Sequence, residues 1–255
     1  SAIMSPLVSI IIPYYKKENF IKQTVQSILS QTFKKYEIII INDENSKLSI
    51  DLLNRIASID KRIKLINNKR NLGAGKSRNI GIKKAKGRFI AFCDSDDLWV
   101  KDKLKYQLKY MQKYNIKFCF TSYQIINKRN ISLGIIRAKK YMNFKHLLNS
   151  CDIGLSTVIL NKNILSNKKY EFAPLKTKED YVLWLKLARS GIIMRGYNKT
   201  LSKWRKTENS LSSSNIQKIL DGYRVYKIYL GLGWIKSLFC LINLSLNFIM
   251  KYKNL

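Results

Sequence analysis

The sequence predicts an α/β fold, in which a sheet is flanked by helices and a helical extension follows at the carboxyl end. Short Ile- and Val-rich runs alternate with helical stretches between Leu7 and Cys93, a pattern typical of βαβ units. The length of 255 residues, 46% of them hydrophobic, is sufficient for the core of one large domain. Only three residues are proline, which excludes collagen-like and Pro-rich classes.

The first part of the chain predicts four strands with three helices between them. The strands are the apolar runs at residues 8–13, 37–41, 63–66 and 89–93. The helices fall near residues 18–30, 48–58 and 75–85, and in the first of them Ile21, Val25 and Ile28 share one face. Parallel strands connected in this way end at the same edge of the sheet, so we expect ligands to bind at that edge.

The second part departs from this alternation and supplies further elements. A basic helix is predicted near residues 100–114, strands near 117–126 and 156–160, and an amphipathic helix near 178–190. No stretch is long enough to link two such domains, and no internal repeat is visible. We therefore expect one domain over residues 1–210 and a helical extension over residues 211–255.

The stretch at residues 232–250 is largely apolar, with Lys236, Asn243 and Asn247 toward one face. These polar residues disfavour a membrane span, because the stretch is close to the minimum length for one. A helix lying in the membrane interface fits better, with lysines at anionic headgroups and an apolar face in the acyl boundary. That face consists of Trp234, Leu238, Phe239, Ile242, Leu246 and Ile249. The alternative is a helix pair that packs on the domain or on another subunit.

The net charge of +32, from 48 Lys and Arg against 16 Asp and Glu, predicts a basic surface and an anionic partner. Nucleic acid, an anionic membrane and phosphorylated small molecules all fit this charge. An AT-rich genome, which raises Lys, Ile and Asn together, would explain the excess without a partner. The four cysteines form no CxxC pair, so free thiols in a reducing cytosol are the simplest interpretation.

An acidic cluster follows the fourth predicted strand, with Asp94, Asp96 and Asp97 within four residues. Carboxylates this close repel one another unless a cation lies among them. Hard oxygen ligands beside a phosphate-bearing substrate suit Mg²⁺ or Mn²⁺. Because the strand end fixes these side chains at the sheet edge, the cluster predicts a metal-assisted nucleotide site.

Two helix starts carry further candidate residues. A glycine-bearing turn at residues 71–75 enters the third predicted helix, where Lys76 and Arg78 would attract a diphosphate. Its spacing matches neither a Walker loop nor the dinucleotide fingerprint. Glu179 and Asp180 open the helix near residues 178–190, where two acids either favour the helix dipole or supply a catalytic base.

Together these motifs resemble the nucleotide-sugar glycosyltransferases of family 2, which have the GT-A fold. The resemblance runs through residues 8–15, 36–46, 71–81, 94–97 and 178–185, and so covers roughly the first 210 residues. Five motifs in this order are far more specific than any one of them. The resemblance implies a Rossmann-like, nucleotide-binding mixed sheet.

The resemblance also implies roles for residues on the donor side. Pro13 and Tyr14 would line the pocket for the base, and Asp43 would hydrogen-bond a uracil-like ring. Arg78 would approach the diphosphate, and Asp94 would contact the ribose and the sugar.

On the reaction side, the resemblance implies that Asp96 ligates Mn²⁺ or Mg²⁺ and that Asp97 supports the donor or the metal. Asp180 is implied as the catalytic base, with Glu179 beside it. A departing nucleoside diphosphate needs positive charge and no general acid, whereas an acceptor hydroxyl needs a base. One base opposite the leaving group gives a single displacement and therefore inversion.

Two positions depart from the family pattern. Many relatives carry two aspartates after the second strand, where this chain has Asn42 and Asp43, so base recognition would differ in detail. Relatives often place a histidine where this chain has Thr207. Phosphate, water or another residue would then complete the metal coordination.

The sequence therefore predicts a metal-dependent, inverting glycosyltransferase. It would move one hexosyl or N-acetylhexosaminyl unit from a nucleotide sugar, a UDP-sugar above all, to a glycan or lipid-linked glycan in bacterial surface polysaccharide or glycoconjugate assembly. We expect it in the cytoplasm, peripheral at the inner face of the cytoplasmic membrane, with an anionic membrane surface as partner and no nucleic acid. The alternatives are a catalytically silent scaffold that binds sugar nucleotides and a basic nucleic-acid-binding protein.

Overall fold

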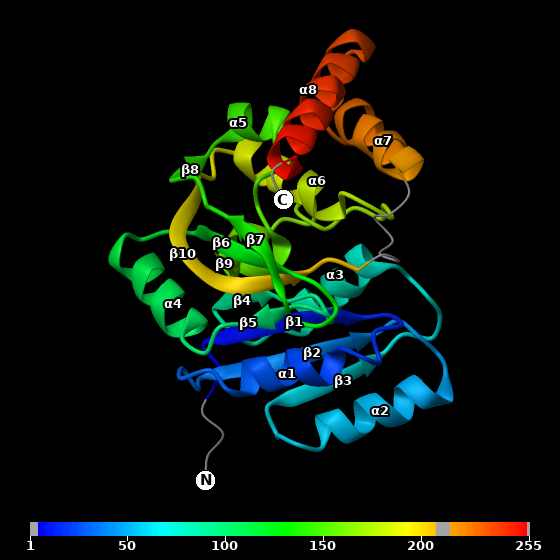
Figure 1. The fold of residues 1–255 in the computed structure, drawn as a ribbon, viewed down its shortest axis with the longest axis vertical. Helices are drawn as coiled ribbons and strands as arrows, with labels where there is room; N and C mark the ends of the chain where they lie inside the picture. Colours follow the sequence, from blue (N-terminus) through cyan, green and yellow to red (C-terminus); the bar gives the residue numbers. More distant parts are fainter. Residues whose placement is uncertain (1–4, 208–214, 254–255) are drawn as a thin grey trace.

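The computed structural model describes residues 5–207 and 215–253 and shows one mixed sheet with helices on both faces (Figure 1). Within these residues the sheet has ten strands, most of which follow the order β3-β2-β1-β4-β9-β6-β10-β5. The remaining two, β7 and β8, pair with β6 and β10. The predicted α/β class with a mixed sheet is thus confirmed.

The first part of the chain folds as the sequence predicts. Its strands are β1 (Val8–Tyr14), β2 (Tyr36–Asn42), β3 (Ile63–Asn67) and β4 (Phe89–Phe92), all parallel to their neighbours in this group. The helices between them are α1 (Ile21–Leu29), α2 (Lys47–Ala57) and α3 (Ala74–Lys84). β1 lies between β2 and β4, so every residue of this strand is buried.

The second part makes the sheet mixed. After β5 (Leu98–Trp99) and α4 (Lys103–Lys113) come β6 (Phe118–Ile126), β7 (Ser132–Ile136), β8 (Tyr141–Met142) and α5 (Phe144–Asn149). The 3-10 turn η1 (Leu155–Thr157), β9 (Ile159–Asn161), the turn η2 (Lys162–Leu165), α6 (Glu179–Arg189) and β10 (Met194–Arg205) follow. β9 is antiparallel to β4 and β6, whereas β10 runs parallel to β6.

β10 has no counterpart among the predicted elements, although it is twelve residues long. Its pairing with β6 shifts register twice between Tyr197 and Ser202. A bulge of this kind breaks the period of two on which strand prediction depends. The polar run at residues 198–200 hides the strand further.

α6 lies in the hydrophobic core on the face of the sheet that also carries the terminal helices. It is buried along most of its length, whereas the sequence predicts an amphipathic helix. The ring of Trp184 packs edge-on against Phe118 and Phe172, with centroids 4.8 and 5.9 Å apart. The Tyr181 hydroxyl lies 2.9 Å from that of Tyr226. These contacts hold the helix that carries the acidic pair Glu179 and Asp180.

The terminal helices α7 (Asn215–Arg224) and α8 (Trp234–Tyr252) lie together at the end of the molecule remote from α2 (Figure 1). A single π-helical turn, η4 (Val225–Tyr229), follows α7. Within the ranges that the structure describes, no helix is long and apolar enough to cross a membrane. The predicted boundary between residues 210 and 211 falls in the segment 208–214, outside the described residues.

α8 turns polar side chains toward the domain and an apolar face outward. The side-chain amides of Asn243 and Asn247 donate to Asn149, at 3.0 and 2.8 Å. Cys240 and Leu244 are buried against the domain. All six residues of the predicted apolar face are 43–62% exposed. The helix therefore packs on the domain and still presents an apolar surface, while its contact with a membrane stays a prediction.

Candidate functional site

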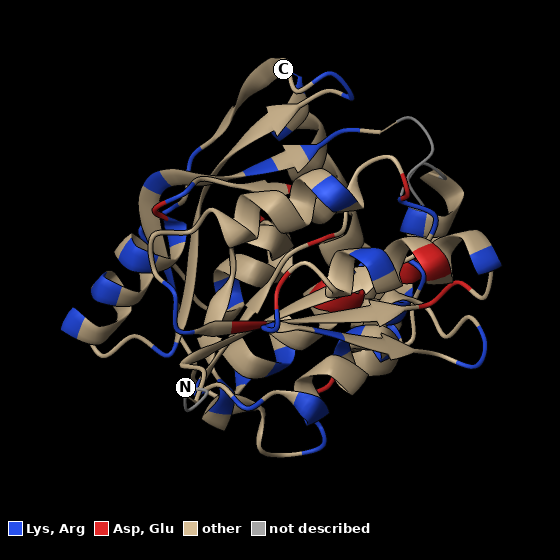
Figure 2. Cartoon of the chain, turned by 90° about the horizontal axis from the view of Figure 1, so that it is seen from below, with Lys and Arg blue, Asp and Glu red and all other residues tan. Residues whose placement is uncertain are grey.

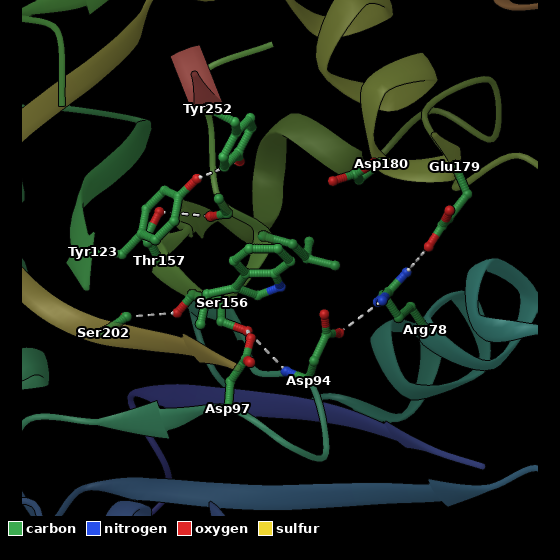
Figure 3. A pocket seen from close by; sticks show the side chains of 13 residues that line it. Arg78, Asp94, Asp97, Tyr123, Ser156, Thr157, Glu179, Asp180, Ser202 and Tyr252 are labelled. Carbon is green, nitrogen blue, oxygen red and sulfur yellow. Dashed lines mark hydrogen bonds and ion pairs between the residues drawn. The ribbon is translucent and has the colours of Figure 1, made fainter. Parts of the chain in front are cut away.

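A cavity of about 190 Å³ opens at the sheet edge where β4 ends and α6 begins (Figure 3). We refer to it as the reaction cavity. Its charged lining residues are Arg78, Asp94, Asp97, Glu179 and Asp180. Its other lining residues are Tyr123, Gly154, Leu155, Ser156, Thr157, Ser202, Trp204 and Tyr252. The structure thus brings five of the predicted site residues together, from α3, the loop after β4, and α6.

Arg78 links two of the acids. It is 3% exposed, and its guanidinium donates to Asp94 Oδ1 and to Glu179 Oε1, each at 2.8 Å. Burial alone would lower the pKa of Arg78, but the charges of Asp94 and Glu179 outweigh it and raise that pKa. Arg78 therefore stays charged and ties the loop after β4 to α6. Its predicted contact with a diphosphate stays a prediction.

Asp180 projects into the reaction cavity from the first turn of α6 (Figure 3). Its Oδ1 accepts the backbone N–H of Tyr181 at 2.8 Å. Within the described residues it has neither an ion pair nor a hydrogen bond from another side chain. Burial first, and then the negative charge of Glu179, raise the pKa of Asp180 to about 7 against the opposing charge of Arg78. A carboxyl group that titrates near neutral pH is suited to accept a proton.

Ser156, in the turn η1, forms several hydrogen bonds to the loop after β4. We refer to this loop, which carries Asp94, Asp96 and Asp97, as the acidic loop. Its hydroxyl donates to Asp97 Oδ2 at 2.5 Å and accepts the backbone N–H of Asp94 at 2.9 Å. Its carbonyl oxygen accepts from Trp99 Nε1 at 2.9 Å and from the Ser202 hydroxyl at 3.0 Å. No motif in the sequence points to this serine, because its partners come from distant segments.

Asp97 lines the reaction cavity but is almost entirely buried, and its predicted support of the donor or the metal stays a prediction. It is 1% exposed, and its second oxygen, Oδ1, accepts the backbone N–H of Arg205 at 2.9 Å. Burial, followed by the charges of Asp96 and Asp94, raises the pKa of Asp97 well above its usual range. Both carboxylate oxygens are used within the protein, so Asp97 holds the loop in place.

Asp96 pairs with Lys17, a residue that the sequence motifs do not single out. Lys17 Nζ lies 2.7 Å from Asp96 Oδ2. Within the described residues, no three His, Cys, Asp or Glu side chains converge on a position for a metal ion. Mg²⁺ is usually held by one or two carboxylates, with phosphate oxygens and water completing its shell. Asp94 and Asp96 therefore fit a hard divalent cation that binds together with substrate phosphates.

Thr207 stands where relatives often place a histidine. Its hydroxyl oxygen is buried and has no hydrogen-bond partner among the described residues. A hydroxyl is a weaker ligand than imidazole for transition metals but suits a hard cation or water. This position therefore agrees with a metal shell completed from outside the protein.

Pro13 and Tyr14 are buried at the end of β1, and their predicted place in the pocket for the base stays a prediction. Tyr14 has no exposed surface, and its hydroxyl lies 3.2 Å from that of Ser49. The reason is the central place of β1, which neighbouring strands and helices enclose. Both residues form part of the core below the sheet edge.

Asp43 organises the turn that leads into α3. Its carboxylate accepts the backbone N–H groups of Leu72 and Gly73 at 2.7 and 2.8 Å, and the Asn68 amide at 2.8 Å. Gly73 adopts a φ of 86°, a left-handed conformation that favours glycine. The turn thus has a fixed shape at the sheet edge. The predicted bond from Asp43 to a base stays a prediction.

An aromatic wall closes the side of the reaction cavity away from Arg78. It consists of Tyr123 from β6, Trp204 from β10 and Tyr252 from α8. The two tyrosine hydroxyls lie 3.3 Å apart, and the rings of Trp204 and Tyr252 have centroids 6.5 Å apart. Only the tertiary fold brings these residues together, so the sequence offers no signal for them beyond their residue type.

The reaction cavity is acidic within a strongly basic protein. Figure 2 shows basic segments distributed over most elements and far fewer acidic ones. Five of the 16 acidic residues lie in or beside the cavity, against three basic ones. The acids are Asp94, Asp96, Asp97, Glu179 and Asp180, and the basic residues are Lys17, Arg78 and Arg205. A diphosphate entering here needs additional positive charge.

Residues 9–167 match the family model for Glycosyl transferase family 2. The chain belongs to this family. It is 32% identical over 247 residues to the putative teichuronic acid biosynthesis glycosyltransferase TuaG of Bacillus subtilis (strain 168), covering 96% of this chain and 97% of that protein. It is 36% identical over 214 residues to the UDP-Glc:alpha-D-GlcNAc-diphosphoundecaprenol beta-1,3-glucosyltransferase WfgD of Escherichia coli, covering 84% and 82%. This family 2 protein is a glycosyltransferase.

Solved structures confirm the fold. TarS residues 1–349 of S. aureus in complex with UDP-GlcNAc superpose with a TM-score of 0.74 at 20% identity, covering 95% of this chain and 72% of that one. The mannosyltransferase PcManGT of Pyrobaculum calidifontis, in complex with GDP-Man and Mn²⁺, gives a TM-score of 0.68 at 13% identity, covering 96% and 75%. The family 2 chain therefore has the GT-A fold that the motifs predict.

Proposed function

We propose that this family 2 glycosyltransferase transfers one hexosyl or N-acetylhexosaminyl unit from a UDP-sugar, with inversion, to a lipid-linked glycan in bacterial surface polysaccharide assembly. The observation that carries the proposal is Asp180, the carboxylate in the reaction cavity that has no side-chain partner among the described residues and titrates near neutral pH. The likeness to WfgD, whose name gives UDP-Glc as donor and a diphosphoundecaprenol-linked sugar as acceptor, supports this choice of donor and acceptor.

Asp180 acts as the base in this proposal. Its carboxylate takes the proton from the acceptor hydroxyl as that oxygen attacks the anomeric carbon, an effect of about two to four powers of ten in rate. Glu179 increases the proton affinity of Asp180, and Arg78 limits the increase. The base and the leaving diphosphate lie on opposite sides of the donor sugar, so one displacement inverts the anomeric centre.

Asp94 and Asp96 would hold Mn²⁺ or Mg²⁺. When bound, the ion would supply the positive charge that the departing diphosphate requires. Arg78 and Lys17 orient these two carboxylates, at 2.8 and 2.7 Å. Ser156 and Asp97 keep the backbone of the acidic loop in place.

The aromatic wall receives the acceptor. Tyr123, Trp204 and Tyr252 offer large rigid surfaces with polar tips, on which the apolar side of a sugar ring packs while its hydroxyls stay hydrogen-bonded. Because α8 supplies Tyr252 and also exposes an apolar face, the enzyme works at the cytoplasmic surface of the membrane, as a peripheral protein.

A panel of nucleotide sugars tests the proposal. Each donor is incubated with Mn²⁺ and a GlcNAc-diphosphate-polyprenol acceptor, and the product is analysed by mass spectrometry and NMR. We expect one UDP-sugar to be consumed and the product to have the opposite anomeric configuration. Transfer with retained configuration would contradict the single-displacement mechanism, and no transfer from any donor would contradict the function.

A further inference from the structure

A second cavity, of about 480 Å³, lies between α7 and α8. We refer to it as the α7–α8 groove. Its apolar walls are formed by Ile219, Leu241, Leu244, Phe248 and Ile249. Its basic lining residues are Lys178, Lys218 and Lys251. The transfer chemistry described above uses none of these side chains.

Two segments of the chain contribute lining residues to both the groove and the reaction cavity. Lys178 lines the groove, and Asp180, two residues later, lines the reaction cavity. Lys251 lines the groove, and the next residue, Tyr252, lines the reaction cavity. Consecutive Cα atoms are about 3.8 Å apart. At both places the linings of the two cavities are separated by no more than two residues of the chain.

The charges in the groove favour an anion. Within the described residues, neither Lys178 nor Lys218 has a carboxylate within ion-pair distance, and Lys251 shares Asp152, the one acidic residue among those of the groove lining, with Lys139. Burial, and then the positive charge of Lys178, lower the pKa of Lys218. An anion placed between like charges relieves their repulsion.

The backbone of Lys178 supports a fixed position for this charge. Its φ is 59°, in the left-handed region that side chains other than glycine rarely adopt. Such a conformation persists only where the surrounding structure holds it. Lys178 directly precedes α6, so the same segment positions the basic group in the groove and Asp180 in the reaction cavity.

We propose that the α7–α8 groove binds the diphosphate and the first isoprene units of a polyprenyl-diphosphate-linked acceptor, whose sugar lies in the reaction cavity. This inference rests on the proposed function, because it assigns a site to that acceptor. Lys178 and Lys218 contact the diphosphate, and the apolar walls contact the isoprenoid. The volume of the groove is that of a pocket for a small ligand, so it holds only the first isoprene units. The rest of a long prenyl chain continues along the exposed apolar face of α8.

An anionic phospholipid is the less suitable occupant. It has a charged headgroup and apolar chains, but it has no sugar that would extend from the lysines to Asp180. A sugar linked through a diphosphate to a prenyl chain has one part for each of three surfaces: the aromatic wall, the lysines of the groove and its apolar walls.

Binding of farnesyl diphosphate tests the groove, with UDP and Mn²⁺ present to fill the donor site. The variant Lys218→Gln/Ile219→Asn alters the groove, and Lys227→Gln/Ile228→Asn is the matched control. Both pairs are Lys-Ile, and the control pair lies exposed on η4, outside the groove lining. We expect the groove variant to weaken binding about tenfold or more, since a charge-assisted contact is lost, while the control binds as the unaltered chain does. Equal binding by both variants would overturn the proposal.

Competition experiments identify the part of the ligand that is recognised. Farnesol and inorganic diphosphate should each compete far more weakly than farnesyl diphosphate, because each lacks one half of the contacts. Displacement of farnesyl diphosphate by phosphatidylglycerol vesicles at equal lipid concentration would overturn the choice of occupant. Binding to the groove is read without turnover, so it is distinguishable from a failure of the unaltered chain to transfer sugar, which would contradict the proposed function alone.

Discussion

At Asp180, two neighbouring charges act on one proton in opposite directions. Glu179 precedes it in the chain and favours the protonated form, whereas Arg78 favours the ionised form. Arg78 is itself held between Glu179 and Asp94. Asp180 and the loop that carries Asp94 are therefore coupled through one guanidinium group.

We expect Asp180→Asn to lower the transfer rate by about two to four powers of ten, because the amide cannot accept the acceptor proton. Donor binding should change little, since Asp180 holds neither the metal nor the diphosphate in our proposal. The measurements are initial rates with the accepted donor and the affinity for UDP. Asp51→Asn, at an exposed position on α2, is the matched control. A variant that retains a tenth or more of the rate would exclude Asp180 as the base.

The pH profile of kcat/KM should rise through about pH 7, where Asp180 becomes ionised in the free enzyme. Removing the negative charge of Glu179 by Glu179→Gln should lower the pKa of Asp180 and move this rise to lower pH. Removing the positive charge of Arg78 by Arg78→Met should move it to higher pH. Shifts in the reverse directions, or a profile unaffected by both changes, would contradict the assignment.

The site residues that follow from the sequence are those in short strings. Asp94, Asp96 and the Glu179-Asp180 pair stand beside a strand end or a helix start, where local patterns reveal them. Lys17 and Ser156 act through partners that are distant in the chain, so the same patterns are silent about them. For buried residues such as Tyr14, a motif indicates a place along the strand and says nothing about exposure.

At the scale of elements, α4 is hydrogen-bonded to the turn η1 through Lys103. Lys103 is fully buried, donates to the carbonyl oxygen of Thr157 at 3.0 Å, and lies 4.9 Å from the ring centroid of Trp99. Burial lowers the pKa of Lys103 to about 7. η1 also carries Ser156, so this lysine is connected to the acidic loop through the turn.

The stability of the protein should therefore depend on pH through Lys103. Its folded pKa of about 7 lies below its ordinary value of 10.5, so between these values the folded state binds fewer protons than the unfolded state. The contribution of Lys103 to stability rises with pH in this window, by at most about 1.4 kcal/mol per pH unit. Lys103→Met should remove this rise in urea unfolding, whereas Lys105→Met, on the exposed side of α4, should retain it. The same pH dependence in both variants would contradict the account.

Elements with a regular local pattern are those that the sequence predicts well. The βαβ units from β1 to β4 appear within three residues of their predicted bounds, because each has a continuous apolar strand. β10 and the buried surroundings of α6 depend on contacts with β6, α5 and η4, which no local period records.

At the scale of the whole molecule, the acidic reaction cavity, the basic surface and the apolar face of α8 occupy different parts of the protein. Acidic residues gather at the reaction cavity, whereas the chain as a whole has a net charge of +32. α8 extends from the far end of the molecule to the reaction cavity, where Tyr252 lines the wall (Figure 1). A protein of this shape would hold its cavity close to a membrane surface.

Flotation with liposomes checks this arrangement. We expect binding that requires anionic lipid, weakens with salt, and falls several-fold in Phe239→Gln/Ile242→Gln, because both side chains are exposed on α8. The matched control, Leu48→Gln/Ile59→Gln, removes two exposed apolar side chains at the opposite end of the molecule. Equal flotation of both variants would place the membrane contact elsewhere.

In our proposal, a cation held by Asp94 and Asp96 binds the diphosphate of the nucleotide sugar at the reaction cavity. A crystal structure of the chain with UDP and Mn²⁺ tests it most directly. Our account requires the manganese ion to contact at least one of these two carboxylates and the diphosphate, with the uridine toward the turn at residues 71–73. Manganese bound away from both aspartates, or UDP bound outside this edge of the sheet, would contradict it.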